Sequence, residues 1–201
     1  MIKNYIWDFD GMLFDSYPHC ATAFVKMMAD HDISVDYNEV IRLMRNSYND
    51  AYQRYDVNDA QKKLLKTYER DQNITPIVTP YPDTYQVLET IYKRGGRNFL
   101  YTHRDLSAVE YIKTYDMDGF FTEFVTSDNN FKSKPEPDAI LYLVEKYKMD
   151  KSETIMIGDR EIDVLAGKNA GIRSCLFDEF RKNLPTAADT TVTEIIRVLD
   201  I

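Results

Sequence analysis

Short apolar runs alternate with helical patterns along most of this chain, and this alternation restricts its fold more than any other feature. Five runs of strand length are apolar at their centres and end at polar residues or glycine: 2–7, 98–101, 123–126, 154–157 and 172–177. Helical spacing of apolar residues appears over 83–94, after Asp105, after Pro137 and from Ile162 to Gly171. Strands that alternate with helices predict a parallel sheet with helices on both faces. Ligands of such sheets gather at the carboxyl ends of the strands.

One segment breaks the alternation. From about residue 17 to residue 80 we find helical runs over 21–29, 37–45 and 58–71 but no convincing strand, and three prolines then mark the return. We therefore expect an α/β, Rossmann-like core of residues 1–15 and 82–201, with a small α-helical cap of residues 16–81 inserted after the first strand. An insert at the end of that strand is suited to act as a lid. The alternative is that its helices only pack on the core.

Composition narrows the class of protein. A chain of 201 residues forms one large domain, or a main domain with a small insert. Its 25 Lys+Arg and 33 Asp+Glu give a net charge of −8, which argues against nucleic acid polymers and membranes as partners. No apolar run reaches the roughly 18 residues of a membrane span, and no signal-peptide pattern is present, so we expect a cytoplasmic protein. Cys20 and Cys175 fit neither a disulfide framework nor a zinc site.

Acidic residues follow two of the expected strands. Asp8 and Asp10 come after the first, where Gly11 allows a tight turn, and Asp159 and Asp163 come after the run 155–157. Carboxylates that converge repel by about 4 kcal/mol per pair at ~4 Å and an effective dielectric of 20, and a cation removes this repulsion. Oxygen ligands without His or Cys favour a hard ion, and few carboxylates suit Mg²⁺ better than Ca²⁺. Two such clusters argue against the alternative that these aspartates only cap turns.

Two further segments can bind phosphate. Thr102 and His103 stand just before an expected helix, where a hydroxyl and free backbone N–H groups face the same edge of the sheet. Lys134 precedes Pro135 and Pro137 in a rigid loop that can aim one ammonium group inward. Each of these segments alone is weak evidence for a phosphate site. Their order along the chain, together with the acidic clusters, makes the prediction stronger.

The stretches DFDGMLFDS, YTHRD, KPEPD and GDREID, in that order, resemble the four motifs of the haloacid dehalogenase superfamily of phosphotransferases over nearly the whole chain. The helical insert resembles the small cap of its phosphoglycolate phosphatase and β-phosphoglucomutase branch. The resemblance implies that Asp8 is the nucleophile, which forms an aspartyl-phosphate, and that Asp10 is the general acid and then the base.

The resemblance also implies ligands. Mg²⁺ would be held by Asp8, the backbone carbonyl of Asp10 and Asp159, with Asp163 supporting Lys134 or the metal from behind. The phosphoryl group would be bound by Thr102 and Lys134, and we place Gly11 and His103 at the same phosphate site. Lys134 would also stabilise the charge of the nucleophile.

Departures from the family pattern bear on the reaction. His103 stands where many relatives have Asn, and it either contacts substrate or packs at the hinge. In residues 45–49, Asn46 and Asn49 replace the Gly and Arg of the mutases' substrate loop, and Pro18 matches the phosphatases' hinge. The side chains that we single out as candidates for substrate specificity are Arg45, Tyr48 and His19.

We therefore expect a Mg²⁺-dependent phosphomonoesterase, a hydrolase that acts on a small phosphorylated metabolite. The alternative is a phosphosugar mutase or a pyrophosphatase/nucleotidase of the same superfamily. A noncatalytic phosphometabolite-binding protein is less favoured because no catalytic position is missing. Dehalogenation is disfavoured because the superfamily's dehalogenases lack the second acid, Asp10.

Overall fold

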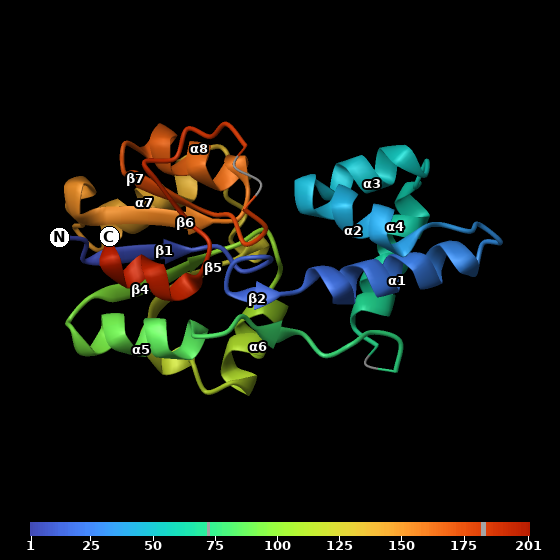
Figure 1. Ribbon diagram of the computed structural model, residues 1–201, viewed down its shortest axis with the longest axis horizontal. Coiled ribbons are helices and arrows are strands. Elements are labelled where there is room, and N and C mark those ends of the chain that lie inside the picture. The colour runs from blue at the N-terminus through green and yellow to red at the C-terminus, as the bar shows by residue number, and fades with distance from the viewer. Residues whose placement is uncertain (72, 182–183) are drawn as a thin grey trace. The chain divides into compact units, whose positions relative to one another are not determined.

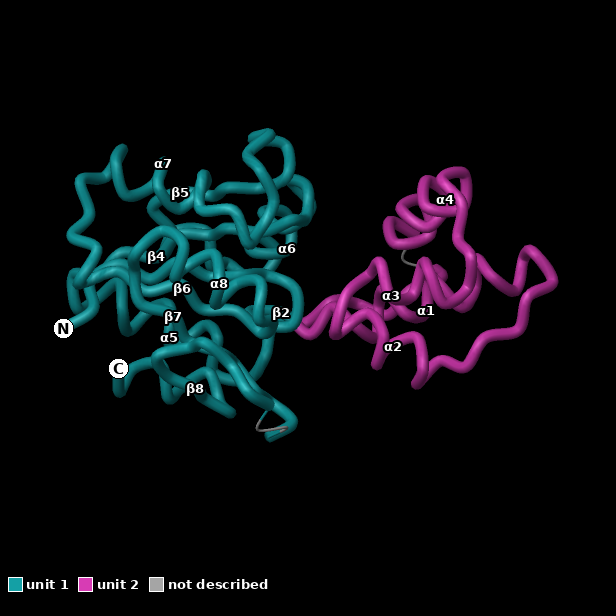
Figure 2. The backbone as a smooth tube through the Cα atoms, turned by 90° about the horizontal axis from the view of Figure 1, so that it is seen from above, with its two compact units in different colours: residues 1–14, 80–201 teal, residues 15–79 magenta. Residues whose placement is uncertain are grey.

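The computed structural model describes residues 1–71, 73–181 and 184–201. The chain forms two compact units (Figure 2): Met1–Phe14 together with Pro80–Ile201 make up the first unit, and Asp15–Thr79 make up the second. The first unit is therefore discontinuous in sequence, and the second is a single continuous insert.

A six-stranded sheet forms the centre of the first unit. Its strand order is β5-β4-β1-β6-β7-β8, and every neighbouring pair is parallel. The strands are β1 (Asn4–Trp7), β4 (Arg97–Tyr101), β5 (Phe121–Val125), β6 (Thr154–Gly158), β7 (Arg173–Phe177) and β8 (Thr190–Val192). Strands β1 and β6 are buried at every position, as is typical of parallel strands that are covered on both faces. The predicted α/β fold is confirmed.

Helices cover both faces of this sheet (Figure 1). They are α5 (Thr84–Lys93), α6 (Ser107–Thr114), α7 (Asp138–Lys146) and α8 (Glu161–Ala170). On one face, Ile6 and Met156 share a buried cluster with Leu143 of α7. On the other, the Asn98 side chain donates a hydrogen bond to the Leu88 carbonyl of α5. Successive residues of a strand point to opposite faces, so each strand contributes to both layers.

The second unit is helical and has its own core. Its helices are α1 (Tyr17–Ala29), α2 (Tyr37–Asn46), α3 (Tyr48–Arg54) and α4 (Asp59–Glu69). Phe24, Met44 and Leu65 are buried in one cluster whose members all come from this unit. Local signals set the helix starts: the Asp36 side chain accepts a hydrogen bond from the Glu39 amide. Across the three described stretches, no helix is both long and apolar enough to cross a membrane.

The structure corrects two expectations from the sequence, both about short strands. Strand β8 extends the sheet beyond the five expected strands. Strand β3 (Thr79–Pro80), which pairs with β2 (Phe14–Asp15), lies in the segment of residues 17–80 that we expected to contain no strand. These strands have only two or three residues, too few to show an alternating pattern. Residues 45–49, compared above with a substrate loop, form the junction between α2 and α3 at Ser47.

Candidate active site

The register of the sheet brings separate chain segments to one edge. Trp7, the last residue of β1, lies opposite Leu100 of β4 and Ile157 of β6. The residues that follow these strands therefore leave the sheet at the same carboxyl edge. The ladder continues for one more bond, because the amide of Asp8 donates to the Ile157 carbonyl at 2.9 Å.

A tight turn follows Asp8 and carries Asp10. The amides of Leu13 and Phe14 both donate to the Phe9 carbonyl, at 3.1 and 3.0 Å. Gly11 adopts a φ of 75°, in the left-handed region that costs other residues more than glycine. The expected role of Gly11 in freeing the backbone for a turn thus has a conformational basis.

Lys134 lies between two buried aspartates. It precedes α7 in a loop with a cis Lys134–Pro135 peptide bond. Its Nζ donates to Asp8 Oδ1 at 2.7 Å, to Asp163 Oδ1 at 2.7 Å and to the Tyr101 carbonyl at 3.1 Å. The lysine side chain is 0% exposed, and these three acceptors use all three of its donors. The sequence prediction of an inward-pointing ammonium is matched by this geometry.

Asp163 is the fixed partner of Lys134. It sits fully buried in the first turn of α8, where its Oδ2 accepts from the Arg160 amide at 3.1 Å. A Cβ on Gly158 would lie 2.3 Å from Asp163 Cγ, so only glycine fits at the end of β6. Both oxygens of Asp163 are hydrogen-bonded within the protein, and the residue therefore supports Lys134 directly.

The two aspartates differ electrostatically. Burial opposes the ionisation of Asp163, but the charges of Lys134 and Arg160 and their hydrogen bonds outweigh it and hold its pKa below the usual value. For Asp8, burial is the largest influence; Lys134 opposes it and Asp163 adds to it, and the pKa rises to about 6. The pKa of Lys134 is raised despite burial, because Asp163 and Asp8 both favour its charged form. Asp8 is therefore the more basic of the two carboxylates.

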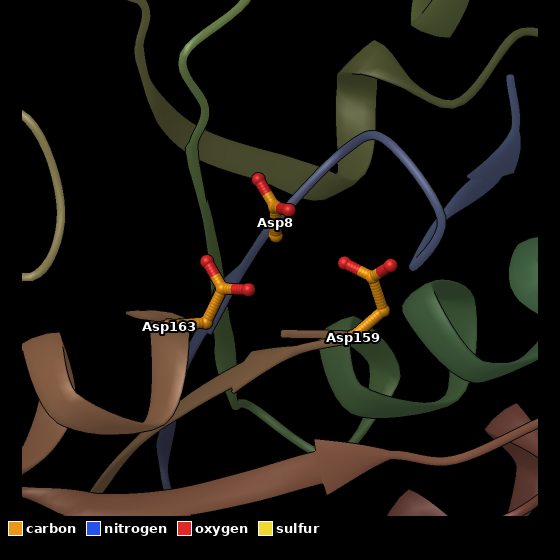
Figure 3. Close-up of side chains that lie close together, drawn as sticks. All are labelled: Asp8, Asp159 and Asp163. Carbon is orange, nitrogen blue, oxygen red and sulfur yellow. The ribbon is translucent and has the colours of Figure 1, made fainter. Parts of the chain in front are cut away.

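Three carboxylates converge near this lysine (Figure 3). Asp8, Asp159 and Asp163 each offer one oxygen, and these oxygens lie within 4.8 Å of one another. Asp8 Oδ2 is buried and has no hydrogen-bond partner among the residues that the structure describes. A buried carboxylate oxygen without a partner is costly unless a cation or a donor arrives. The donor set, oxygen only and partly unsatisfied, fits a hard divalent ion.

The side chain of Asp10 lies apart from this carboxylate cluster and pairs with Arg104, whose Nη2 is 2.7 Å from Asp10 Oδ1. Arg160 pairs with a member of the cluster, with its Nε 3.8 Å from Asp159 Oδ1. Sequence reasoning missed both arginines, although each stands inside a motif stretch directly beside a residue that was singled out. Their charge was the available signal, since an arginine beside clustered carboxylates is expected to pair with them.

The expected phosphate residues take defined positions. Thr102 is buried directly after β4, and its Oγ1 accepts from the Arg104 amide at 3.0 Å. His103 Nε2 accepts from the Lys134 amide at 2.9 Å. Partial burial of the His103 ring, followed by the charges of Lys134 and Arg160, lowers its pKa to about 4. The ring is therefore neutral at pH 7, as an acceptor nitrogen must be.

The three candidate specificity residues belong to the second unit. His19 is buried in α1, with Nδ1 2.9 Å from the Pro76 carbonyl. Arg45 lies in the last turn of α2 and places its Cζ 5.4 Å from the centre of the Tyr17 ring. Tyr48 begins α3, and its ring centre lies 6.2 Å from that of Tyr52. All of these contacts lie within the second unit.

Fold and site together define an α/β protein with a buried carboxylate–lysine–carboxylate centre at the carboxyl edge of its sheet. The family model described as "Haloacid dehalogenase-like hydrolase" matches residues 5–177. The chain belongs to this family, as the four sequence motifs predicted.

Named relatives and solved structures agree with this membership. The chain is 24% identical over 184 residues to pyrophosphatase PpaX of Halalkalibacterium halodurans, and the matched region covers 87% of this chain and 83% of that protein. It is 33% identical over 95 residues to phosphoglycolate phosphatase of Vibrio parahaemolyticus, covering 47% of this chain and 42% of that one. A crystal structure of a hydrolase from Streptococcus pneumoniae has a TM-score of 0.71 and 32% identity, over 100% of this chain and 99% of that chain.

Proposed function

We propose that this protein is a Mg²⁺-dependent phosphatase that hydrolyses the ester bond of a small phosphorylated metabolite through an aspartyl-phosphate on Asp8. One observation carries the proposal: the buried Asp8 carboxylate has Oδ1 held 2.7 Å from Lys134 Nζ, while Oδ2 has no hydrogen-bond partner among the described residues. A raised pKa makes this carboxylate a stronger nucleophile than an exposed aspartate.

The reaction would divide one difficult displacement into two. In the first step an Asp8 oxygen attacks phosphorus, the bond from phosphorus to the leaving oxygen breaks, and the carboxyl group of Asp10 gives its proton to that oxygen. In the second, water attacks phosphorus, its proton passes to the Asp10 carboxylate, and inorganic phosphate leaves Asp8 as a carboxylate again. Lys134 would stay paired with Asp8 and Asp163, and Thr102, which directly follows β4, would bind phosphoryl oxygens.

Charge supports a role for the metal. Mg²⁺ would be held by Asp8, the backbone carbonyl of Asp10 and Asp159, with Asp163 left to hold Lys134. When bound, the ion would neutralise charge and polarise a phosphoryl oxygen. The first step requires a protonated Asp10, so the charged carboxylates of Asp8, Asp159 and Asp163 face an equal number of cationic side chains. Without a metal the site therefore has no net positive charge with which to attract an anionic substrate.

Within this proposal, the second unit (Asp15–Thr79) serves as the helical cap and supplies substrate specificity. The names of relatives support two bond classes, since one is a pyrophosphatase and another a phosphoglycolate phosphatase. Hydrolysis of pyrophosphate is therefore the second candidate function.

The test compares Asp8→Asn with wild type and with Asp150→Asn as a control. Asp150 stands before β6, at the opposite end of the strand from the site, and caps a short turn there. With Mg²⁺ and 4-nitrophenyl phosphate, we expect Asp8→Asn to lose essentially all turnover and Asp150→Asn to keep it. Undiminished turnover by folded Asp8→Asn would reject Asp8 as the nucleophile.

A substrate panel then separates the candidates. It contains phosphoglycolate, sugar phosphates, nucleotides and pyrophosphate, assayed by phosphate release. We expect one of the phosphate esters to have the highest kcat/KM of the panel. If pyrophosphate has the highest kcat/KM instead, the protein is a pyrophosphatase and the ester proposal is wrong. Conversion of one sugar phosphate into an isomer without release of phosphate would indicate a mutase.

A further inference from the structure

Arg104 pairs with Asp10, and the reaction proposed above assigns no role to this arginine. Its Nε and Nη2 both donate to Asp10 Oδ1, at 3.0 and 2.7 Å, while Asp10 Oδ2 lies 3.3 Å from Nε. The two side chains are 11% and 19% exposed, so the pair is largely shielded from water. A guanidinium that grips a carboxylate through two nitrogens restricts its orientation as well as its position.

Arg104 is itself anchored by three separate features. Its amide donates to Thr102 Oγ1 at 3.0 Å, and its carbonyl accepts from the Ser127 amide at 3.0 Å. Its Cζ lies 5.5 Å from the centre of the Phe9 ring. Phe9 is fully buried and stacks on Phe14, with ring centres 4.5 Å apart. The guanidinium is therefore packed on the fixed ring of Phe9, which directly precedes Asp10 in the chain.

We propose that Arg104 is a positioning residue for the proton transfers of Asp10. Because Oδ1 takes the two shorter hydrogen bonds from the guanidinium, a proton on this carboxyl group belongs on Oδ2. Arg104 thus fixes which oxygen carries the proton and the direction in which Asp10 presents it. In the first step that proton moves from Oδ2 to the leaving oxygen as the bond from phosphorus breaks, and in the second Oδ2 takes a proton from water. The inference rests on the proposed function, because Asp10 transfers these protons only in that reaction.

The leaving group provides a readout that a purely structural role would not change. An alkyl phosphate needs its leaving oxygen protonated, whereas 2,4-dinitrophenyl phosphate releases a stable anion without an acid. The parameter to measure is kcat/KM, because it reports the steps up to departure of the leaving group and excludes the later hydrolysis of the aspartyl-phosphate. Glycerol 3-phosphate and 2,4-dinitrophenyl phosphate are suitable probes.

The variants are Arg104→Gln, Arg104→Lys, Asp10→Asn and the double variant Arg104→Gln with Asp10→Asn. Arg97→Gln is the matched control: Arg97 begins the same strand β4, donates from Nε to Asn4 Oδ1 at 2.9 Å and places Cζ 5.8 Å from the Phe99 ring centre. It therefore resembles Arg104 in pairing and stacking but lies at the amino end of the sheet.

We expect Arg104→Gln to lower kcat/KM for glycerol 3-phosphate by roughly 10- to 100-fold, part of the 10²- to 10⁴-fold that general acid catalysis contributes. For 2,4-dinitrophenyl phosphate it should stay within about twofold of wild type, and Arg97→Gln should do so for both substrates. Arg104→Lys should remain impaired, because lysine lacks the planar fork. The double variant should be no slower than Asp10→Asn alone.

Several results would overturn the inference. An equal loss on both substrates, or a double variant in which the two losses multiply, would show that Arg104 does not act through Asp10. Full activity of Arg104→Lys would reject the need for a bidentate contact. These outcomes are distinct from failure of the proposed function, which would appear as no turnover of either substrate by wild type or as persistent turnover by Asp8→Asn.

Discussion

At the scale of single residues, the site assigns unequal states to two carboxylates that share one lysine. Asp163 has both oxygens hydrogen-bonded within the protein, whereas Asp8 has one such oxygen and one without a partner among the described residues. Asp163 therefore carries the permanent charge opposite Lys134. Asp8 keeps a carboxylate whose ionisation is opposed by burial, and this group is the one that a cation or phosphorus atom would stabilise.

This inequality predicts that Asp8→Asn stabilises the metal-free protein at neutral pH. The pKa of Asp8 is about 6 in the folded protein against an ordinary 3.8. The folded state thus binds its proton more tightly, and stability is lost as the pH rises from about 4 to about 6. Asparagine mimics the protonated form, so the variant should exceed wild type in stability by roughly 3 kcal/mol above pH 6.5 and by progressively less below it.

Thermal unfolding in EDTA between pH 4.5 and 8 measures this difference. Asp150→Asn serves as a control of opposite sign, because hydrogen bonds from Ser152 hold the pKa of Asp150 below its usual value. That variant should be less stable than wild type at neutral pH. Asp8→Asn melting below wild type at every pH would contradict the prediction.

At the scale of elements, the junction between β6 and α8 sets the position of Lys134. Gly158 ends the strand, and Asp163 packs so closely against it that a methyl group would overlap the carboxylate carbon. Because Asp163 is fully buried, it has little room to move away from a larger side chain. The strand end and the first helical turn therefore act together on the lysine, which comes from another loop.

We expect Gly158→Ala to reduce phosphatase turnover more than tenfold and to destabilise the fold by about 1–3 kcal/mol, because the added methyl displaces Asp163 from Lys134. Gly119→Ala is the matched control, since a Cβ there would meet nothing within 4 Å. It should change stability by no more than about 0.5 kcal/mol. Urea unfolding and an aryl phosphate assay test both variants, and equal behaviour of the two would refute this account of the junction.

The sequence patterns predict some of the elements and site residues but not others. The parallel core was predictable because an apolar run of strand length overlaps each of β1, β4, β5, β6 and β7, and helical patterns follow these runs at regular spacing. Strand β8 was not predictable, because Thr190–Val192 has only three residues and becomes a strand by pairing with β7 at the edge of the sheet. The aspartates and Lys134 could be named from motifs. The pairings of Arg104 with Asp10 and of His103 with the Lys134 amide depend on tertiary geometry that no spacing encodes.

At the scale of the whole molecule, each of the two units contains a buried apolar cluster of its own among the described residues. Leu143 belongs to a cluster drawn entirely from the first unit, and Leu65 to one drawn entirely from the second. Groups of residues that share a core tend to open cooperatively. The two units should therefore differ in local stability.

Leu65→Ala and Leu143→Ala form a matched pair, since both side chains are almost completely buried. Each truncation should cost about 2–5 kcal/mol in its own unit. Hydrogen exchange followed by mass spectrometry should show faster exchange in residues 15–79 for Leu65→Ala and in the sheet for Leu143→Ala. Equal acceleration across both units by either variant would indicate a single cooperative block.

The split first unit has a consequence for how the protein emerges from the ribosome. Asn4 of β1 pairs with partners 93 residues later in β4 and 150 residues later in β6. Strand β1, which is buried at every position in the folded protein, therefore has no partner strand while the whole insert is being translated. Domains tend to fold in the order in which they are synthesised. The helical insert, with its local contacts, can fold first, and Asp8 reaches Lys134 only after most of the polypeptide has been made.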